Sequence, residues 1–377
     1  MSPQAEEFTI GVEEEFQIIN PQTHQLCTRS PSILSIAQAV LGEQVVQPEF
    51  RQSQIEIATP ICRSLQEVRT QLLHLRREVI AAAAQDGSQI AAAGIHPFSH
   101  WQEQSFTPKP QYQNLAQQYQ ILMQELVTFG CHVHIGISDR EMAIQVMNRV
   151  RGWLAPMLAL AASSPFWLGK DTGYTSYRTA LISRLPMAGP PPLFNSYSCY
   201  QARVRSFLNT KTIQQPTQIC WDVRPSERFP TLEFRITDMC MTADEAVMIA
   251  GLARALVRTC YEQAIAHTPY APVQSELLRA ANWCAARFGL DAELIDVEAE
   301  CSVPAPKLIE QFLEFVRPAL NDFGEWEDVY PTVQNTMQHG TGAARQRQVY
   351  NRTGRLEDVV DFMVQETAKG TLSPQVI

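Results

Sequence analysis

Polar and apolar residues alternate with a period of two in five short segments of the chain. Because successive side chains of a β-strand point to opposite faces, each segment predicts a strand with one apolar and one polar face. The five segments span 11–18, 54–58, 131–137, 220–224 and 231–237. Half-buried strands of this kind favour antiparallel pairing. We therefore expect a mainly antiparallel sheet with helices packed against its apolar face.

The polar faces of these predicted strands carry Glu, His, Asp and Arg but no Lys. The side chains assigned to these faces are Glu13, Glu15, Glu56, His132, His134, Asp222, Arg224, Glu233 and Arg235. These residue types bind metals and phosphates, so the polar face of the sheet is the candidate functional site. Glu14 falls on the apolar side of its strand, and the pattern offers no reason for it.

Capping boxes predict three helices. In each box a hydroxyl can accept the backbone N–H three residues later while a glutamate reaches back to the first residue. The boxes begin at Ser64, Ser138 and Thr242, and Pro156 predicts a kink in the second helix. Capping and periodicity together predict helices over 64–84, 111–127, 138–162, 242–267, 275–288, 305–315 and 356–367. The stretch 165–198, rich in Pro, Gly and Ser, is predicted to be either a functional loop or a linker.

Length and composition describe a folded protein, and the predicted strands and helices place it in the α+β class. A chain of 377 residues allows one large domain or two, and we assign a single domain over 1–377 with a helical C-terminal part from about 270. Apolar residues make up 45% and charged residues 18%, which excludes wholesale disorder. The net charge of −9 disfavours binding to nucleic acid or to an anionic membrane surface.

The cysteines and the apolar segments predict a cytoplasmic protein. Nine cysteines are scattered along the chain and never form a CxxC motif, so we expect them to be reduced and mostly buried. Cys131 lies on the apolar face of its strand and should be inert. The longest apolar stretch, 153–162, is too short to span a bilayer. The N-terminal residues have no apolar signal core.

The carboxylates of the polar face predict bound cations. Two carboxylates ~4 Å apart repel by roughly 4 kcal/mol at an effective dielectric constant of 20, so either some are protonated or cations lie between them. An HxH pair such as His132 and His134 also occurs in zinc sites, but no third His and no Cys lies on a comparable polar face. Oxygen ligands with one imidazole suit Mg²⁺ or Mn²⁺. With arginines alongside, these residues suggest metal-dependent phosphoryl transfer, without a Walker A loop or a GxGxxG motif.

Six short motifs in this order point to a known family. They are Gly11–Phe16 (GVEEEF), 56–59 (EIAT), 94–98 (GIHPF), 129–136 (FGCHVHIG), 222–226 (DVRPS) and 231–235 (TLEFR). Together they resemble the motifs of the type 2 glutamate–cysteine ligase family, the carboxylate–amine ligases, over residues 8–370, and most closely those of its cyanobacterial and proteobacterial members. The resemblance implies a glutamine-synthetase-like fold, whose curved, mainly antiparallel sheet has the active site on its polar concave face.

The resemblance also implies a reaction. ATP would phosphorylate the γ-carboxylate of L-glutamate, and the amine of L-cysteine would attack the γ-glutamyl phosphate, which is the first step of glutathione biosynthesis. Two or three Mg²⁺ ions would act as cofactors, with Mn²⁺ as a substitute, and the family allows a homodimer. Three alternatives stay open: a carboxylate–amine ligase with another amine substrate, a related-fold phosphotransferase and a non-catalytic binding protein.

By the same resemblance, individual residues receive roles. The metal ligands map to Glu13, Glu15, Glu49, Glu56, His132 and Glu233. Arg235 would contact phosphate, and His134 would orient a substrate or a carboxylate. In the predicted loop, Arg178 is the candidate for recognising a substrate carboxylate, because a guanidinium can bind it bidentately. Substrate or nucleotide binding is further assigned to Asp222, Arg224, Arg345 and Arg347, the last two as part of a nucleotide cover over 339–352.

Structural roles are the alternatives for several of these residues. Glu13 could lie on a merely solvated strand face, and Glu233 and Arg235 could form an ordinary ion pair. Pro48, directly before Glu49, weakens the assignment of that segment to a strand. His96 either ends a buried strand or takes part in catalysis.

Overall fold

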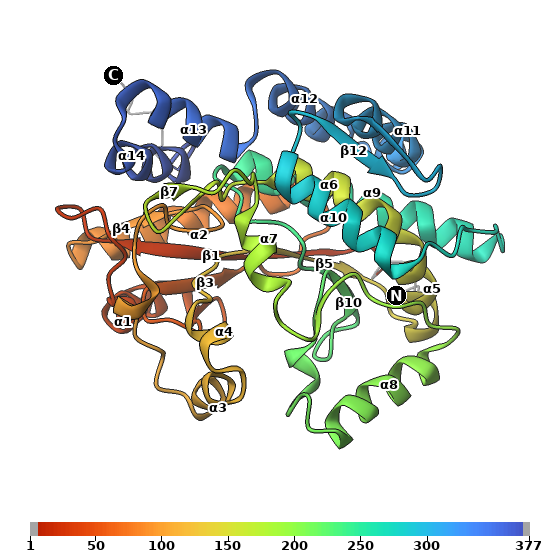
Figure 1. The fold of residues 1–377 in the computed structure, drawn as a ribbon, viewed down its shortest axis with the longest axis horizontal. Coiled ribbons are helices and arrows are strands. Elements are labelled where there is room, and N and C mark those ends of the chain that lie inside the picture. Colours follow the sequence, from red (N-terminus) through yellow and green to blue (C-terminus); the bar gives the residue numbers. More distant parts are fainter. Residues whose placement is uncertain (1–6, 372–377) are drawn as a thin grey trace.

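The alternating segments form one antiparallel sheet in the computed structural model, which describes residues 7–371 (Figure 1). Its seven strands are β1 Ile10–Ile19, β2 Val46–Pro48, β3 Gln54–Ala58, β4 Gln89–Ala91, β5 Cys131–Gly136, β10 Val223–Pro225 and β11 Thr231–Phe234. Six of them follow the order β10-β11-β5-β1-β3-β2, and β4 pairs with the C-terminal end of β1 on the edge opposite β3. All pairings in this sheet are antiparallel, as predicted.

Two of the predicted strands are shorter than the alternation suggested. The segment 220–224 divides into β9 Cys220–Trp221 and β10, with Asp222 between them, because β9 pairs with β8 Ala188–Gly189 outside the main sheet. In the segment 231–237, β11 ends at Phe234, and the backbone N–H of Arg235 donates instead to the carbonyl of Asp222. The remaining strands form the pairs β6 Phe166–Trp167 with β7 Lys170–Asp171 and β12 Glu293–Asp296 with β13 Cys301–Pro304.

Helices make up most of the rest of the described chain. They are α1 Ser30–Leu41, α2 Leu65–Gln85, α3 Pro110–Tyr119, α4 Ile121–Gln124, α5 Arg140–Val150, α6 Leu154–Ala161, α7 Tyr177–Ile182, α8 Tyr197–Asn209, α9 Ala243–Ile265, α10 Ser275–Phe288, α11 Ala305–Phe323, α12 Trp326–His339, α13 Gly342–Thr353 and α14 Leu356–Thr367. Short 3₁₀ turns cover Trp101–Glu103, Arg151–Trp153 and Pro216–Gln218. The predicted helices over 275–288 and 356–367 have the predicted bounds, whereas α1, α7, α8, α12 and α13 were not predicted as helices.

The capping signals were correct for two of the three helices. Ser64 begins α2, and Thr242 begins α9 with a complete capping box. At the third site Asp139, not Ser138, caps α5 by accepting backbone N–H groups of its first turn. The break in the predicted helix 138–162 falls at the 3₁₀ turn Arg151–Trp153, before Pro156. Pro156 then lies in the first turn of α6, where its missing N–H leaves no intrahelical bond unmade.

The apolar face of the sheet packs against α2 and α9. Buried apolar side chains from Phe8 to Met363 form one contiguous cluster, so the C-terminal helices share the core of the sheet. In Figure 1 the sheet crosses the middle of the molecule, with α11, α12, α13 and α14 above it and α3 and α8 below it. None of the helices within residues 7–371 is long and apolar enough to cross a membrane. All nine cysteines are free, and Cys131 is buried on the apolar face.

The glutamate on the apolar face of β1 has a partner on α2. Glu14 and Arg76 are both fully buried, and the Nη2 and Nε atoms of Arg76 donate to the two carboxylate oxygens at 2.5 and 2.9 Å. Arg76 also donates to the backbone carbonyls of Cys240 and Met241 at 3.0 and 2.9 Å. The pair therefore ties α2 and the segment after β11 to the back of the sheet.

Candidate active site

Strand register brings polar residues from distant segments side by side. The directly opposed pairs are Glu13–His132, Glu15–Glu56, His134–Glu233 and Arg224–Glu233. Their side chains face a cavity of about 1180 Å³ on the polar side of the sheet. Eleven of the thirteen predicted site residues line it, namely Glu13, Glu15, Glu49, Glu56, His132, His134, Arg178, Asp222, Arg224, Glu233 and Arg235. The cavity is also lined by α3, α7 and the segment that follows α7, so the predicted loop 165–198 forms a wall of the site.

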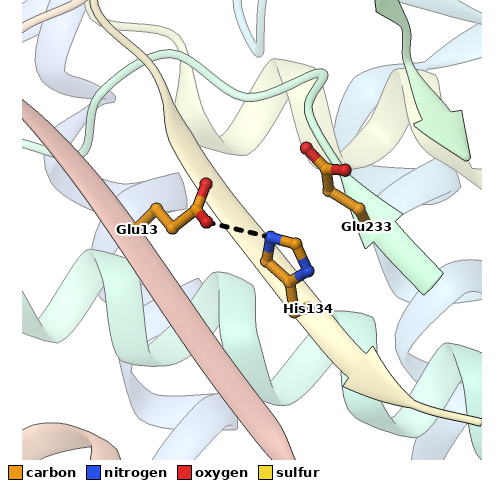
Figure 2. Close-up of side chains that lie close together, drawn as sticks. All are labelled: Glu13, His134 and Glu233. Carbon is orange, nitrogen blue, oxygen red and sulfur yellow. Dashed lines mark ion pairs between the residues drawn. The ribbon is translucent and has the colours of Figure 1, made fainter. Parts of the chain in front are cut away.

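Three residues at the centre of the polar face form a group that could hold a cation. Ligand atoms of Glu13, His134 and Glu233 all lie within 4.8 Å of one another (Figure 2). The Nε2 atom of His134 is 3.3 Å from the Glu13 carboxylate, and its Nδ1 atom is 3.0 Å from the hydroxyl of Thr231. His132 lies on the other side of that carboxylate, with Nδ1 3.3 Å from Oε2. The geometry therefore places His134, which was predicted only to orient other groups, among the candidate ligands together with His132.

These contacts shift the pKa values of the three groups. Burial opposes ionisation of Glu13, but hydrogen bonds with His132 and His134 outweigh it, so the pKa of Glu13 lies well below its ordinary value. Burial and the positive charge of Arg235 lower the pKa of His132. Burial also disfavours the charged form of His134, but its contact with Glu13 raises the pKa of His134 overall. Glu13 is therefore a carboxylate, the form in which it can bind a cation.

A second group of carboxylates lies where β1, β2 and β3 run together. Glu49 directly follows β2, an edge strand in which Pro48 is tolerated as the last residue. Burial raises the pKa of Glu49 to about 7, and the negative charge of Glu15 adds to this shift. Burial and the charges of Glu13, Glu49 and Glu15 raise the pKa of Glu56 well above its ordinary value. Carboxylates held this close in a half-buried cavity fit a site that divalent cations neutralise.

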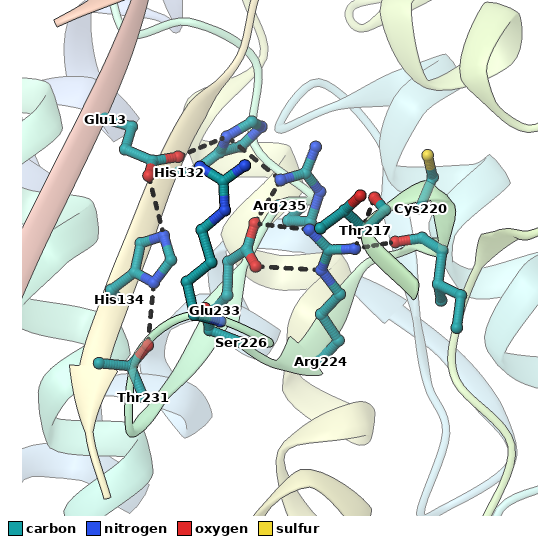
Figure 3. A network of polar contacts seen from close by, with 12 residues as sticks. Glu13, His132, His134, Thr217, Cys220, Arg224, Ser226, Thr231, Glu233 and Arg235 are labelled. Atoms are coloured by element: carbon teal, nitrogen blue, oxygen red, sulfur yellow. Dashed lines mark hydrogen bonds and ion pairs between the residues drawn. The ribbon is translucent and has the colours of Figure 1, made fainter. Parts of the chain in front are cut away.

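Two arginines surround Glu233 (Figure 3). Arg224 donates to the two carboxylate oxygens from Nε and Nη2 at 3.0 and 3.3 Å, and Arg235 pairs with the same carboxylate. Burial would raise the pKa of Glu233, but Arg235 and Arg224 lower it overall. The Nη1 atom of Arg224 donates to the carbonyls of Thr217 and Ile219 at 2.9 and 2.6 Å. The ion pair between Glu233 and Arg235 is therefore present, but within the cavity rather than on a solvated surface.

Two further predicted residues lie on the wall of the cavity next to α10. Arg178 on α7 is buried, and its Nε atom has no hydrogen-bond partner among the described residues. Asp222 accepts a hydrogen bond of 2.7 Å from the side-chain amide of Asn282 on α10. Burial raises the pKa of Asp222 to about 7, against the opposing effect of that hydrogen bond. Asn282 was not predicted, because a single polar residue on a helix gives no alternating pattern.

Arg345 and Arg347 do not lie at this cavity, contrary to the placement expected from the sequence. The segment 339–352 is largely the helix α13, which packs against α14 above the sheet in Figure 1. Arg345 pairs with Glu245 and Glu366, and both its Nη atoms are engaged. Arg347 donates to Asp171 at 2.8 and 2.7 Å. Their guanidinium groups thus join helices and loops, and α13 does not cover the site.

His96 likewise has a structural environment. Its Nδ1 atom accepts the backbone N–H groups of Phe98 and Ser99 at 3.2 and 2.9 Å, and its Nε2 atom lies 2.9 Å from the carbonyl of His24. It is buried and does not line the cavity.

Other residues that line the cavity could not be found by alternation, namely Lys109, Tyr112, Arg228, Arg279 and Trp283. These residues come from helices and loops, where side chains do not alternate between two faces with a period of two.

Comparison with known proteins agrees with this architecture. The family model described as "Glutamate-cysteine ligase family 2(GCS2)" matches residues 9–366. A protein of Solibacter usitatus named "Putative glutamate--cysteine ligase 2" is 38% identical over 375 residues, covering 99% of this chain and 97% of that protein. A protein of the same name from Herpetosiphon aurantiacus is 39% identical over 363 residues, covering 96% of this chain and 94% of that one.

Solved structures share the fold at low sequence identity. Glutamate–cysteine ligase from Francisella tularensis in complex with AMP has a TM-score of 0.71 at 11% identity, covering 97% of this chain and 90% of that chain. A bifunctional glutathione synthetase from Pasteurella multocida has a TM-score of 0.67 at 14% identity, covering 97% of this chain and 52% of that chain. The glutamine-synthetase-like fold and the family match define an ATP-dependent carboxylate–amine ligase. The chain belongs to glutamate–cysteine ligase family 2.

Proposed function

We propose that this protein joins the γ-carboxylate of L-glutamate to the amine of L-cysteine at the expense of ATP. The observation that carries the proposal is the convergence of carboxylates, two imidazoles and the predicted arginines Arg178, Arg224 and Arg235 on one cavity of about 1180 Å³. A carboxylate cannot form an amide directly, because hydroxide is a very poor leaving group. Phosphorylation to γ-glutamyl phosphate divides this hard step into two easier ones, since phosphate leaves readily. The product, γ-glutamylcysteine, would be the first intermediate of glutathione biosynthesis.

The carboxylates of the cavity are suited to hold two or three Mg²⁺ ions, with Mn²⁺ as a substitute. Glu13 and Glu233, with His134 or His132, would form one position, and Glu15, Glu49 and Glu56 would provide the ligands of the other side. The raised pKa values of Glu49 and Glu56 support this arrangement. Burial and mutual repulsion disfavour the ionised carboxylates, and bound cations would offset that repulsion. When bound, such ions clamp a triphosphate and balance its charge.

The three predicted arginines of the cavity have two kinds of role: one holds Glu233 in place, and the other two are candidates to bind substrate groups. Arg224 directs its Nε and both Nη atoms to Glu233 and two carbonyls, so we assign it to hold Glu233 in place. The half-buried Arg235 reaches the cavity beside Glu233 and is the candidate to contact phosphate. Arg178 has an unpaired Nε–H and is the candidate to bind the carboxylate of an amino-acid substrate. Asp222, on the same wall, can accept a hydrogen bond from the substrate ammonium group.

The direct test is a screen of amino acids with glutamate and ATP, read by mass spectrometry. We expect γ-glutamylcysteine and ADP to appear together, with release of ADP dependent on both amino acids. ADP formed without any amide would favour the phosphotransferase, and an amide with another amino acid would reassign the amine. Glu13→Gln or Glu233→Gln should fold and lose turnover by orders of magnitude. Glu43→Gln, at an exposed glutamate outside the cavity, is the matched control and should retain full activity.

A further inference from the structure

One fully buried carboxylate lies behind the site and does not line the cavity. Asp238, in the segment after β11, forms a bridge to Gly130 at the start of β5. Its Oδ2 atom accepts the backbone N–H of Ser163 at 2.9 Å and the hydroxyl of Ser164 at 2.7 Å. Its Oδ1 atom accepts the hydroxyl of Ser176 at 2.7 Å. Ser164 lies between α6 and β6, and Ser176 directly precedes α7, the helix that carries Arg178.

The carboxylate determines how these two hydroxyls are oriented. An ionised carboxylate only accepts hydrogen bonds, so both hydroxyl protons point at Asp238 and leave the oxygen lone pairs free. The oxygen of Ser164 accepts the backbone N–H of Arg178 at 3.1 Å. The oxygen of Ser176 accepts the backbone N–H of Thr179 at 3.3 Å and thereby caps α7. One buried charge thus orients both hydroxyls that hold the first turn of this helix.

The same charge faces the guanidinium of Arg178. The Oδ1 atom of Asp238 lies 4.0 Å from Nη1, and the Nη atoms donate to the carbonyls of Ile236 and Arg235 at 3.4 and 3.3 Å. Gly130 leaves room for this arrangement, since a Cβ atom there would come within 2.5 Å of Nη2. The guanidinium is therefore held on one side, while its buried Nε–H has no partner among the described residues.

We propose that Asp238 is a positioning residue that holds Arg178, through Ser164 and Ser176, in the orientation that binds a carboxylate of the glutamate substrate. The inference rests on the proposed function of Arg178. The expected consequence is specific, because a misaligned guanidinium weakens the binding of one substrate and leaves the nucleotide side of the cavity intact. Loss of the negative charge should therefore affect the KM for glutamate and not the KM for ATP.

The experiment compares Asp238→Asn with the wild type in steady-state kinetics. We expect the KM for glutamate to rise about tenfold or more, as for the loss of one charge-assisted contact, with the KM for ATP changed by less than about twofold. Ser176→Ala should produce a smaller rise in the same direction, and Ser176→Thr, which keeps the hydroxyl, should restore the wild-type value. Circular dichroism and thermal unfolding verify that each variant folds. If Asp238→Asn does not fold, the pair of Ser176 variants still decides the question.

A double variant separates positioning from general damage. If Asp238 acts through Arg178, adding Asp238→Asn to Arg178→Met should leave the KM for glutamate where Arg178→Met alone puts it. Additive effects, or an equal rise in the KM for ATP, would overturn the inference. If Arg178→Met raises the KM for glutamate but Asp238→Asn and Ser176→Ala do not, the inference is wrong while the proposed role of Arg178 stands. If Arg178→Met itself has no effect, that role is refuted, and the inference with it.

Discussion

Replacing Arg76 by methionine tests the explanation for a glutamate on the apolar face of the sheet. The substitution leaves the Glu14 carboxylate buried without its two donors at 2.5 and 2.9 Å. Breaking a buried ion pair from one side costs about 3–5 kcal/mol, because an uncompensated charge remains. The carbonyls of Cys240 and Met241 also lose a donor. Since the free energy of unfolding of globular domains is about 5–15 kcal/mol, Arg76→Met should remove about a fifth or more of the stability.

The double variant Glu14→Met/Arg76→Met provides the decisive comparison. With both charges absent, the remaining cost is that of two unpaired carbonyls, about 1 kcal/mol each, partly offset by apolar packing. We therefore expect the double variant to be more stable than Arg76→Met alone. Urea unfolding followed by tryptophan fluorescence measures these differences, and Arg77→Met, at the exposed neighbour on α2, is the control with an expected change below about 0.5 kcal/mol. A double variant as unstable as the sum of the two single variants would refute the reasoning.

Three further predictions concern pH, metal and the misplaced arginines. Burial lowers the pKa of His96 to about 3, against about 6.5 in the unfolded chain, so the neutral ring stabilises the fold above pH 6.5 and this contribution is lost as the pH falls. Between pH 7 and 5 the wild type should lose about 2 kcal/mol more than His96→Gln in urea titrations, and equal losses would contradict the assignment. Glu56→Gln removes one of several repelling carboxylates, so it should raise the melting temperature of the metal-free protein. It should also reduce the further rise in melting temperature that Mg²⁺ causes. An unchanged response to Mg²⁺ would exclude Glu56 as a ligand. Arg345→Met should lower the melting temperature, since its two ion pairs are lost, without changing the KM for ATP, and a raised KM for ATP would return this residue to the nucleotide site.

Much of the site could be predicted from local pattern. Alternation alone places Glu13, His132 and Glu233 on the polar faces of their strands, because side-chain direction in a strand depends only on position along it. The same rule places Cys131 in the core, and the capping residue Thr242 marks where a helix begins because that contact spans only three residues. The order of the motifs, in turn, was sufficient to indicate the family.

What only the tertiary structure decided depends on contacts between segments far apart in the chain. Register made neighbours of Glu15 and Glu56, and the pairing of β9 outside the sheet interrupted the predicted strand at Asp222. Helix packing placed Arg345 above the sheet, away from the cavity, although the family resemblance suggested a nucleotide cover over 339–352. The burial of Glu14 on the apolar face is explained only by its contact with Arg76, 62 residues away in the chain. A sequence pattern records which way a side chain points from its own backbone, whereas the energy of a buried charge depends on which distant group meets it, and that is set only when the chain folds.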